Sequence, residues 1–329
     1  MIARVLDWFG FSSRGQGHHD HGHRGPDQGR RQGHTHGVVD PTITTTARGI
    51  WAIKWSFVIL AVTAALQLVV VFVSDSVALL ADTIHNIADA GTAIPLWVAF
   101  VLARRKPTQT FTYGYGRVED FAGLAIVLII LLSALVAGYE AVARVIHPRP
   151  VMQLGWLAAA GVIGFLGNEA VAVFRIRTGR QINSAALVAD GYHARTDGLT
   201  SLAVVLGAFG VWMGYALADP IIGLIITAVI LGIVWQSARA VLTRMLDGVE
   251  HATIGELHHA AQHARGVVSV ERIRARWLGH RLYAEMTLAV DPALSLADAR
   301  KVAEDAKEHA CGHLPALESL HVEVVPGRP

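Results

Sequence analysis

Long apolar segments separated by short polar or basic breaks fill the chain up to about residue 244. Each approaches or exceeds the roughly 20 residues that an α-helix needs to cross the hydrocarbon core of a membrane. We expect transmembrane helices at six positions: 49–73, 77–103, 118–146, 151–174, 184–215 and 219–244. The pattern therefore predicts an α-helical polytopic membrane protein whose six-helix membrane domain spans residues 49–244.

The pattern changes after residue 245 to that of a small water-soluble domain. Apolar and polar residues alternate as in half-buried strands, and helical segments flank them. The expected elements are a helix at 251–264, strands at 266–276 and 281–290, a helix at 296–312 and a strand at 320–324. Ser295 is placed to cap the second helix. The order αββαβ predicts a ferredoxin-like α+β domain at 245–329, with a three-stranded sheet against two helices.

Residues 1–48 precede the first predicted helix as a histidine-rich cytoplasmic tail and show no signal-peptide pattern, and their segment 12–40 is polar and rich in glycine and histidine. With almost nothing apolar to bury, we expect it to be disordered. Its histidines lie in two groups: His18, His19, His21, His23, His34 and His36. Clustered imidazoles could hold Zn²⁺, Cu²⁺ or Ni²⁺ loosely. The alternative is a solvated linker with no essential role.

The composition argues against nucleic-acid binding and against any role that needs paired cysteines. Of the 329 residues, 53% are hydrophobic, and the formal net charge is only +2, which gives no indication of a nucleic-acid partner. The single cysteine, Cys311, excludes an intrachain disulfide and a cysteine-based metal site.

The basic residues predict the orientation of the helices. Positive charge is enriched in loops on the cytoplasmic side of membrane proteins. One side of the six-helix arrangement carries most of it: Arg30, Arg31, Arg48, Arg104, Arg105, Lys106, Arg117, Arg175, Arg177, Arg180, Arg239 and Arg244. The other side has Arg144 and Arg149 near a helix end. We therefore expect a multi-pass protein of the inner (plasma) membrane with both termini in the cytoplasm.

A motif with the pattern A-D-x-x-H-x-x-x-D occurs twice, in the second and the fifth predicted helix. Its ionisable positions are Asp82, His85 and Asp89 in the first copy and Asp190, His193 and Asp197 in the second. Positions three, four and seven apart share one helix face. Ionisable residues inside a membrane are costly and mark ion or proton pathways. A structural ion pair is the plainest alternative for either copy, but it gives no reason for the spacing to repeat.

The residue types of the motif favour a transition metal. His85 with Asp89, and His193 with Asp197, are each one helical turn apart, so each pair can reach one ion. Two imidazoles and two carboxylates suit tetrahedral Zn²⁺, and Co²⁺ or Ni²⁺ stay open. Mg²⁺ and Ca²⁺ prefer oxygen ligands alone. An imidazole must be neutral to bind metal and can take a proton once the metal leaves, which couples metal movement to opposite proton movement.

Asp82 and Asp190 lie one turn before the histidines on the same face. Two roles are open for them. They could hydrogen-bond the histidine rings as supporting partners, or they could lie at a cavity mouth and attract cations.

The paired H-x-x-x-D motifs, the segment F-x-Y-G-x-G-R-x-E at 111–119 and the αββαβ domain together resemble the cation diffusion facilitator family. The resemblance covers nearly the whole chain after the tail. It implies a homodimeric metal/proton antiporter that works by alternating access, with His85, Asp89, His193 and Asp197 as transport ligands. The histidine at position 85 is similar to members that prefer zinc, sometimes cobalt or nickel.

The chain departs from the family pattern at two further metal positions. Tyr115 stands where a loop histidine might be, so we expect no second site in the loop 107–116. In the C-terminal domain the common V-H-D-L-R pattern appears as Val270-Glu271-Arg272-Ile273-Arg274, whereas the closing H-x-E survives as His321 and Glu323. A regulatory metal could bind them, joined by His258, His259 or Glu271, and the alternative is a dimerisation domain that works without metal.

The sequence thus predicts proton-coupled efflux of divalent metal, Zn²⁺ or else Co²⁺ or Ni²⁺, with no enzymatic activity and no catalytic cofactor. The expected partners are metal ions, protons, a second copy of the chain and the lipid bilayer. One alternative is an intramembrane zinc metalloenzyme, but no H-E-x-x-H is present and four protein ligands leave no position for water. The other is a metal sensor that does not transport.

Overall fold

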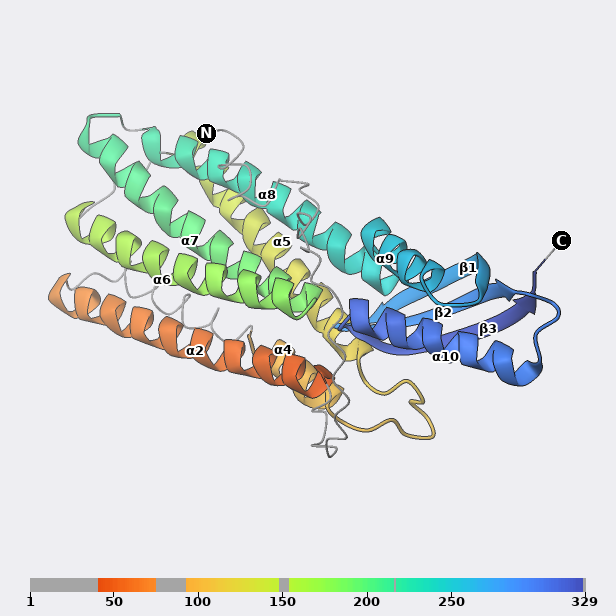
Figure 1. Cartoon of the computed structure of the whole chain (residues 1–329). Helices are drawn as coiled ribbons and strands as arrows, with labels where there is room; N and C mark the ends of the chain where they lie inside the picture. Colours follow the sequence, from red (N-terminus) through yellow and green to blue (C-terminus); the bar gives the residue numbers. More distant parts are fainter. Residues whose placement is uncertain (1–40, 75–92, 148–153, 216, 328–329) are drawn as a thin grey trace, which may run out of the picture.

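The structure is a computed structural model that describes residues 41–74, 93–147, 154–215 and 217–327. Its membrane part consists of α2 (Pro41–Ser74), α4 (Ala93–Ala103), α5 (Arg117–Ile146), α6 (Leu154–Gln181), α7 (Ala185–Trp212) and α8 (Ala218–Met245). The C-terminal part consists of α9 (His251–Gln262), β1 (Val267–Leu278), β2 (Arg281–Val290), α10 (Leu296–His313) and β3 (Leu317–Pro326). The long helices lie side by side in an elongated bundle, and α8 leads into the C-terminal domain at one end (Figure 1).

Four helices of the described ranges are long and apolar enough to cross a membrane, namely those of α2 (Thr45–Phe72), α5, α6 and α8. The fifth predicted span forms α7, which is as long as α6 and α8 but carries Asp190, His193, Arg195 and Asp197. The second predicted span is described only as α4, which ends at Ala103 as expected. Six spans are therefore not established by the described residues.

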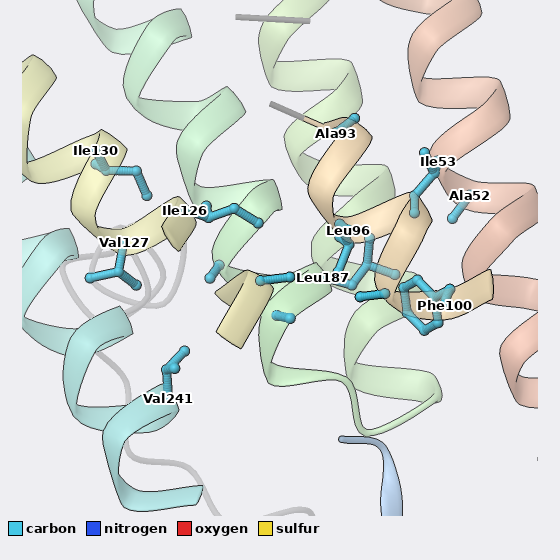
Figure 2. Close-up of a cluster of buried hydrophobic side chains, with 14 of the residues drawn as sticks. Ala52, Ile53, Ala93, Leu96, Phe100, Ile126, Val127, Ile130, Leu187 and Val241 are labelled. Atoms are coloured by element: carbon cyan, nitrogen blue, oxygen red, sulfur yellow. The ribbon is translucent and has the colours of Figure 1, made fainter. Parts of the chain in front are cut away.

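The interior of the bundle is packed with small and aliphatic side chains. Leu96 and Phe100 of α4 lie between Ile53 of α2 and Leu187 of α7 (Figure 2). A Cβ at Gly49 of α2 would come within 2.7 Å of the Phe100 ring, so the glycine permits this close approach. Large apolar side chains such as Phe72 instead face outward. A bundle with this distribution is suited to a lipid environment.

Small residues allow the backbones of α6 and α7 to pack closely against each other. A Cβ at Gly191 of α7 would lie 2.9 Å from the backbone nitrogen of Ile176 on α6. A Cβ at Gly179 of α6 would lie 2.9 Å from the backbone nitrogen of Val188 on α7. Small residues at such contacts let helix backbones approach closely in membranes. The side chains that these two helices direct toward each other are therefore fixed in position.

The C-terminal domain has the predicted αββαβ order, which is confirmed. Its sheet has the strand order β1-β2-β3, with β1 and β2 antiparallel and β2 and β3 parallel. α9 and α10 cover one face, where Leu257, Leu282 and Ala306 belong to one buried cluster. Ser295 caps α10 by accepting a hydrogen bond from the backbone N–H of Asp298, as expected.

A buried polar contact joins the C-terminal domain to the helix bundle. His280, in the turn between β1 and β2, has its Nδ1 2.7 Å from Oε2 of Glu119 on α5, and both side chains are buried. Its Nε2 is 3.0 Å from Oγ1 of Thr46 on α2. Gly279 adopts a φ of +63°, and a Cβ there would lie 2.7 Å from Oε2 of Glu119. The turn thus needs a glycine, both for its left-handed backbone and for the close approach.

Arg117 adds a second contact at this junction. Its guanidinium donates to the carbonyl oxygens of Arg244 and Met245 at the end of α8, at 3.3 and 3.1 Å, and it pairs with Asp247. The start of α5 is therefore fixed to the end of α8.

Candidate functional site

The second copy of the motif lies on α7 with its side chains on one face, as predicted. The side chain of His193 is 2% exposed, and its Nδ1 lies 3.7 Å from Oδ1 of Asp197. α7 begins after Ser184, whose Oγ accepts a hydrogen bond from the N–H of Leu187 at 3.1 Å. The helix continues through the motif to Trp212 without interruption. One helical turn therefore brings the imidazole and the carboxylate together.

The imidazole of His193 lacks hydrogen-bond partners within the described ranges, where neither of its ring nitrogens has one. A polar group buried without a partner costs about 1–3 kcal/mol in proteins, and native structures mostly avoid it. A ligand at this position would supply the missing partner.

The first copy of the motif cannot be placed beside the second. Asp82, His85 and Asp89 fall in the range 75–92, outside the described residues. Within the ranges that the structure does describe, no group of three or more His, Cys, Asp or Glu side chains could hold one metal ion. The four-ligand arrangement with His85 and Asp89 stays a prediction.

Asp190 pairs with an arginine of the neighbouring helix, which is neither of the two roles that the sequence left open for it. Its Oδ2 lies 2.9 Å from Nη1 of Arg175 on α6, and both side chains are at most 2% exposed. The two groups are close but are not aligned as a hydrogen bond. Asp190 therefore neither supports the His193 ring nor lies at a cavity mouth. For His193 this corrects the sequence-based interpretation, whereas support of His85 by Asp190 stays a prediction, because His85 lies outside the described residues.

The helical boundary of α6 explains the correction. The predicted fourth span ended at residue 174, with Arg175, Arg177 and Arg180 in the following loop. α6 instead continues to Gln181, so Arg175 is on the helix and faces α7. A buried guanidinium requires a counter-charge, and the carboxylate on the neighbouring helix supplies it.

A second ion pair joins the same two helices beside His193. Arg195 of α7 donates from Nε to Oε2 of Glu169 at 3.1 Å and from Nη2 to Oε1 at 2.7 Å. Both side chains are largely buried. This two-point geometry is the strong form of the Arg–carboxylate contact. Neither Glu169 nor Arg195 is part of the repeated motif, so the sequence pattern alone does not single out this pair.

The two ion pairs lie on either side of His193 along α7. Each pair sums to no net charge, so the pairs do not by themselves repel a cation. The net negative charge that α7 brings to the predicted site comes from Asp197. The hydroxyls of Thr196 and Thr200 are used locally, because they donate to the carbonyl oxygens of His193 and Asp197 at 2.7 and 2.8 Å.

The three candidate metal ligands His258, His321 and Glu323 of the C-terminal domain do not lie together within a single chain. His321 and Glu323 alternate along β3 with Val322, which packs against the buried cluster, so they lie on the opposite face of the sheet. His258 is on α9, which covers the clustered face. Glu323 accepts a hydrogen bond from Oγ1 of Thr287 at 3.0 Å. Within a single chain, His258 is therefore not joined to His321 and Glu323, which corrects that grouping.

Both domains match described protein families. Residues 53–246 match "Cation efflux transmembrane domain", and residues 249–326 match "Cation efflux protein, cytoplasmic domain". The chain belongs to the cation efflux family. The resemblance that the motifs indicated is confirmed, and the family makes this chain a membrane transporter of cations.

The names of relatives within the family do not agree on one metal. "Probable cation efflux system protein Rv2025c" of Mycobacterium tuberculosis is 52% identical over 288 residues, which are 88% of this chain and 87% of the relative. "Magnetosome protein MamB" of Magnetospira sp. is 27% identical and covers 78% of this chain and 87% of its own. "Manganese efflux system protein MneS" of Bacillus subtilis is 22% identical, with 80% and 91% covered. Family membership thus leaves the metal open.

A solved C-terminal domain of MamM in a cadmium form also aligns with this chain. It is 32% identical, covers 24% of this chain and 98% of its own length, and has a TM-score of 0.23.

Proposed function

We propose that this protein exports divalent transition-metal ions, Zn²⁺ foremost, from the cytoplasm in exchange for protons. The transport ligands are His85, Asp89, His193 and Asp197, which bind the ion in turn from the two sides of the membrane by alternating access. The observation that carries the proposal is the buried imidazole of His193, which lies 3.7 Å from Asp197 and has ring nitrogens without a hydrogen-bond partner among the described residues. The repeat of the same spacing at His85 and Asp89 supplies the other half.

The choice of metal rests on the donor set rather than on the names of relatives. Imidazole with carboxylate suits Zn²⁺, Co²⁺ and Ni²⁺, whereas Mg²⁺ and Ca²⁺ are bound through oxygen. With both histidines neutral, two aspartates balance the charge of one divalent ion. The ion pairs Arg175–Asp190 and Arg195–Glu169 support the site by holding α7 against α6.

Proton coupling follows from the same imidazoles. A histidine that binds metal must be neutral, and it can be protonated when the metal has left. Protons returning through the site therefore displace the metal on the outer side. The direction is supported by the family description of the C-terminal domain as cytoplasmic and by the basic residues near that end of the bundle. We propose a homodimer in the inner membrane with both termini in the cytoplasm.

The test is zinc flux into sealed proteoliposomes that contain the full chain, a trapped zinc-sensitive dye and an imposed pH gradient. His193→Ala and Asp197→Ala should each reduce the flux to that of protein-free liposomes, because each removes a ligand. His251→Ala is the matched control, since His251 is exposed on α9 and should leave the flux unchanged. Undiminished flux in both ligand variants would overturn the site assignment.

Two further measurements separate the alternatives. A panel of Zn, Co, Ni, Fe, Cd and Mn in the same liposomes would identify the metal, and faster Mn than Zn transport would contradict the zinc assignment. Collapse of the pH gradient should stop zinc movement, and unchanged movement would contradict the antiport. Substrate turnover or a metal-induced conformational change without any metal flux would favour the metalloenzyme or the sensor.

A further inference from the structure

A basic cavity lies at the end of the helix bundle that bears the C-terminal domain. It lies between the corner that joins α6 to α7 and the last turns of α8, and its volume is about 490 Å³. Cavities of about 300–1,000 Å³ are typical of sites for small ligands. The transport residues of α7 do not line it. The side chains that give it its chemistry are Arg180, Ser184, Tyr192, Ser237, Arg239 and Arg244, together with one acidic residue, Glu250, which pairs with Arg244.

Two of its three arginines have donors available for a ligand. Arg180 and Arg239 are exposed, and neither forms an ion pair within the described ranges. The Nη2 of Arg180 lies 3.5 Å from the hydroxyl of Tyr192, a long contact that leaves its remaining donors unused. Arg244 is already engaged, because it donates to the carbonyl oxygen of Asn183 and pairs with Glu250 at 3.4 Å. Of the three arginines that line the cavity, Arg180 and Arg239 are therefore the ones whose donors a ligand could use.

Two further features of the cavity favour an anion. α7 begins at Ala185 in its lining, and a helix N-terminus carries a partial positive charge and unpaired N–H groups. Ser237 of α8 also lines the cavity and is only 3% exposed. Its hydroxyl has no hydrogen-bond partner in the part of the chain that the structure describes. A buried donor of this kind is complemented by a ligand oxygen.

The place of the cavity in the fold indicates the source of the anion. Trp235 stands next to the lining residue Gln236 on α8 and is 75% exposed. Tryptophan concentrates at the boundary between lipid and water. In the proposed orientation, on which this inference rests, this boundary is on the cytoplasmic side, where arginines attract the phosphates of anionic lipids and basic recesses between helices bind their headgroups.

We propose that this cavity binds a phosphate-bearing anion, supplied by the headgroup of an anionic membrane phospholipid. The phosphate oxygens accept hydrogen bonds from Arg180, Arg239 and the hydroxyl of Ser237 beside the start of α7. Such binding ties the α6–α7 corner to α8, next to the first residues of the C-terminal domain.

The experiment is native mass spectrometry of the full-length protein in detergent, titrated with phosphatidylglycerol, phosphatidylcholine or inorganic phosphate. The parent should retain phosphatidylglycerol in preference to phosphatidylcholine. Arg180→Gln and Arg239→Gln should each weaken retention about fivefold, since one basic residue near a lipid phosphate contributes about 1 kcal/mol. Ser237→Ala should also weaken it.

Arg177→Gln is the matched control. Arg177 is an exposed arginine of α6 that does not line the cavity, so its variant should bind phosphatidylglycerol like the parent. The arginines exchanged are exposed, so the variants should fold, and unchanged zinc flux in liposomes would verify this. Equal retention of phosphatidylglycerol by the parent and by the double variant of Arg180 and Arg239 would overturn the proposal. Equal affinity for inorganic phosphate and phosphatidylglycerol would overturn the lipid as source.

Discussion

α7 and α10 both carry charged residues at helical spacing, and they place them in opposite surroundings. On α10, Arg300 pairs with Glu304 at 3.1 Å, with side chains 81% and 63% exposed. On α7, Asp190 pairs with Arg175 of α6 at 2.9 Å, with side chains 0% and 2% exposed. The two distances are nearly equal. What separates the pairs is the medium around them.

The comparison shows which charges hold the transport helix. Water screens the α10 pair, so its attraction is offset by the entropy of holding two long side chains. The α6–α7 pairs are inside the bundle, where a charge without a partner is strongly unfavourable. The partners therefore constrain how α7 lies against α6, and α7 carries His193 and Asp197. Charge inside the bundle positions the site, whereas charge on α10 mainly keeps the domain soluble.

The largest expected effect comes from removing one member of the buried pair. Arg175→Leu should lower the free energy of unfolding by about 3–5 kcal/mol, because it leaves Asp190 as an uncompensated buried charge. The measurement is the unfolding transition of the full chain in detergent.

The double variant Arg175→Leu with Asp190→Asn is the control for this experiment. It removes both charges and should recover most of the stability, since a buried pair replaced by uncharged residues is often nearly neutral. If single and double variants unfold alike, the loss comes from altered packing, and the ion pair does not hold the two helices.

Several features of the molecule could be predicted because they depend on local sequence. The basic run 104–106 followed by Pro107 marked the end of α4 at Ala103, and apolar–polar alternation gave the limits of β2. The αββαβ order and the placement of His193 with Asp197 on one face follow from periodicity alone.

Other features depend on contacts between distant parts of the chain. Asp190 precedes His193 by three residues, and this spacing is the same whether Asp190 supports the imidazole or pairs with Arg175. Only the position of α6 decides between these roles. The continuation of α6 past residue 174 was missed because basic residues ordinarily mark a loop, and here one of them turns inward. The contact of Glu119 with His280 joins two domains and has no local signal.

The next effect in size concerns the second buried pair. Glu169→Gln should weaken zinc binding and zinc flux by about 10–100-fold, the range seen when partners of metal ligands are removed. The reason is that the two-point contact of Arg195 with Glu169 holds α7, which carries His193 and Asp197, in place against α6, and the neutral amide would weaken this contact. The measurement is zinc titration together with flux in liposomes.

Glu140→Gln is the matched control for this variant. Glu140 also pairs with an arginine, Arg144, at 3.2 Å, but its side chain is 50% exposed. It should leave zinc binding unchanged, and Glu169→Asp should retain part of it because the charge is kept. A loss of equal size in Glu140→Gln would mean that the effect is not specific to the charge beside His193.

The smallest expected effect comes from removing the exposed ion pair on α10. Arg300→Ala should change the free energy of unfolding by no more than about 0.5 kcal/mol, because exposed i,i+4 pairs contribute about that much and salt screens them. The measurement is the same unfolding transition used for Arg175→Leu, at low and at high salt. A loss as large as that of Arg175→Leu would show that burial does not separate the two pairs. The assignment of a positioning role to the α6–α7 charges would then lose its physical basis, since it depends on the absence of water around them.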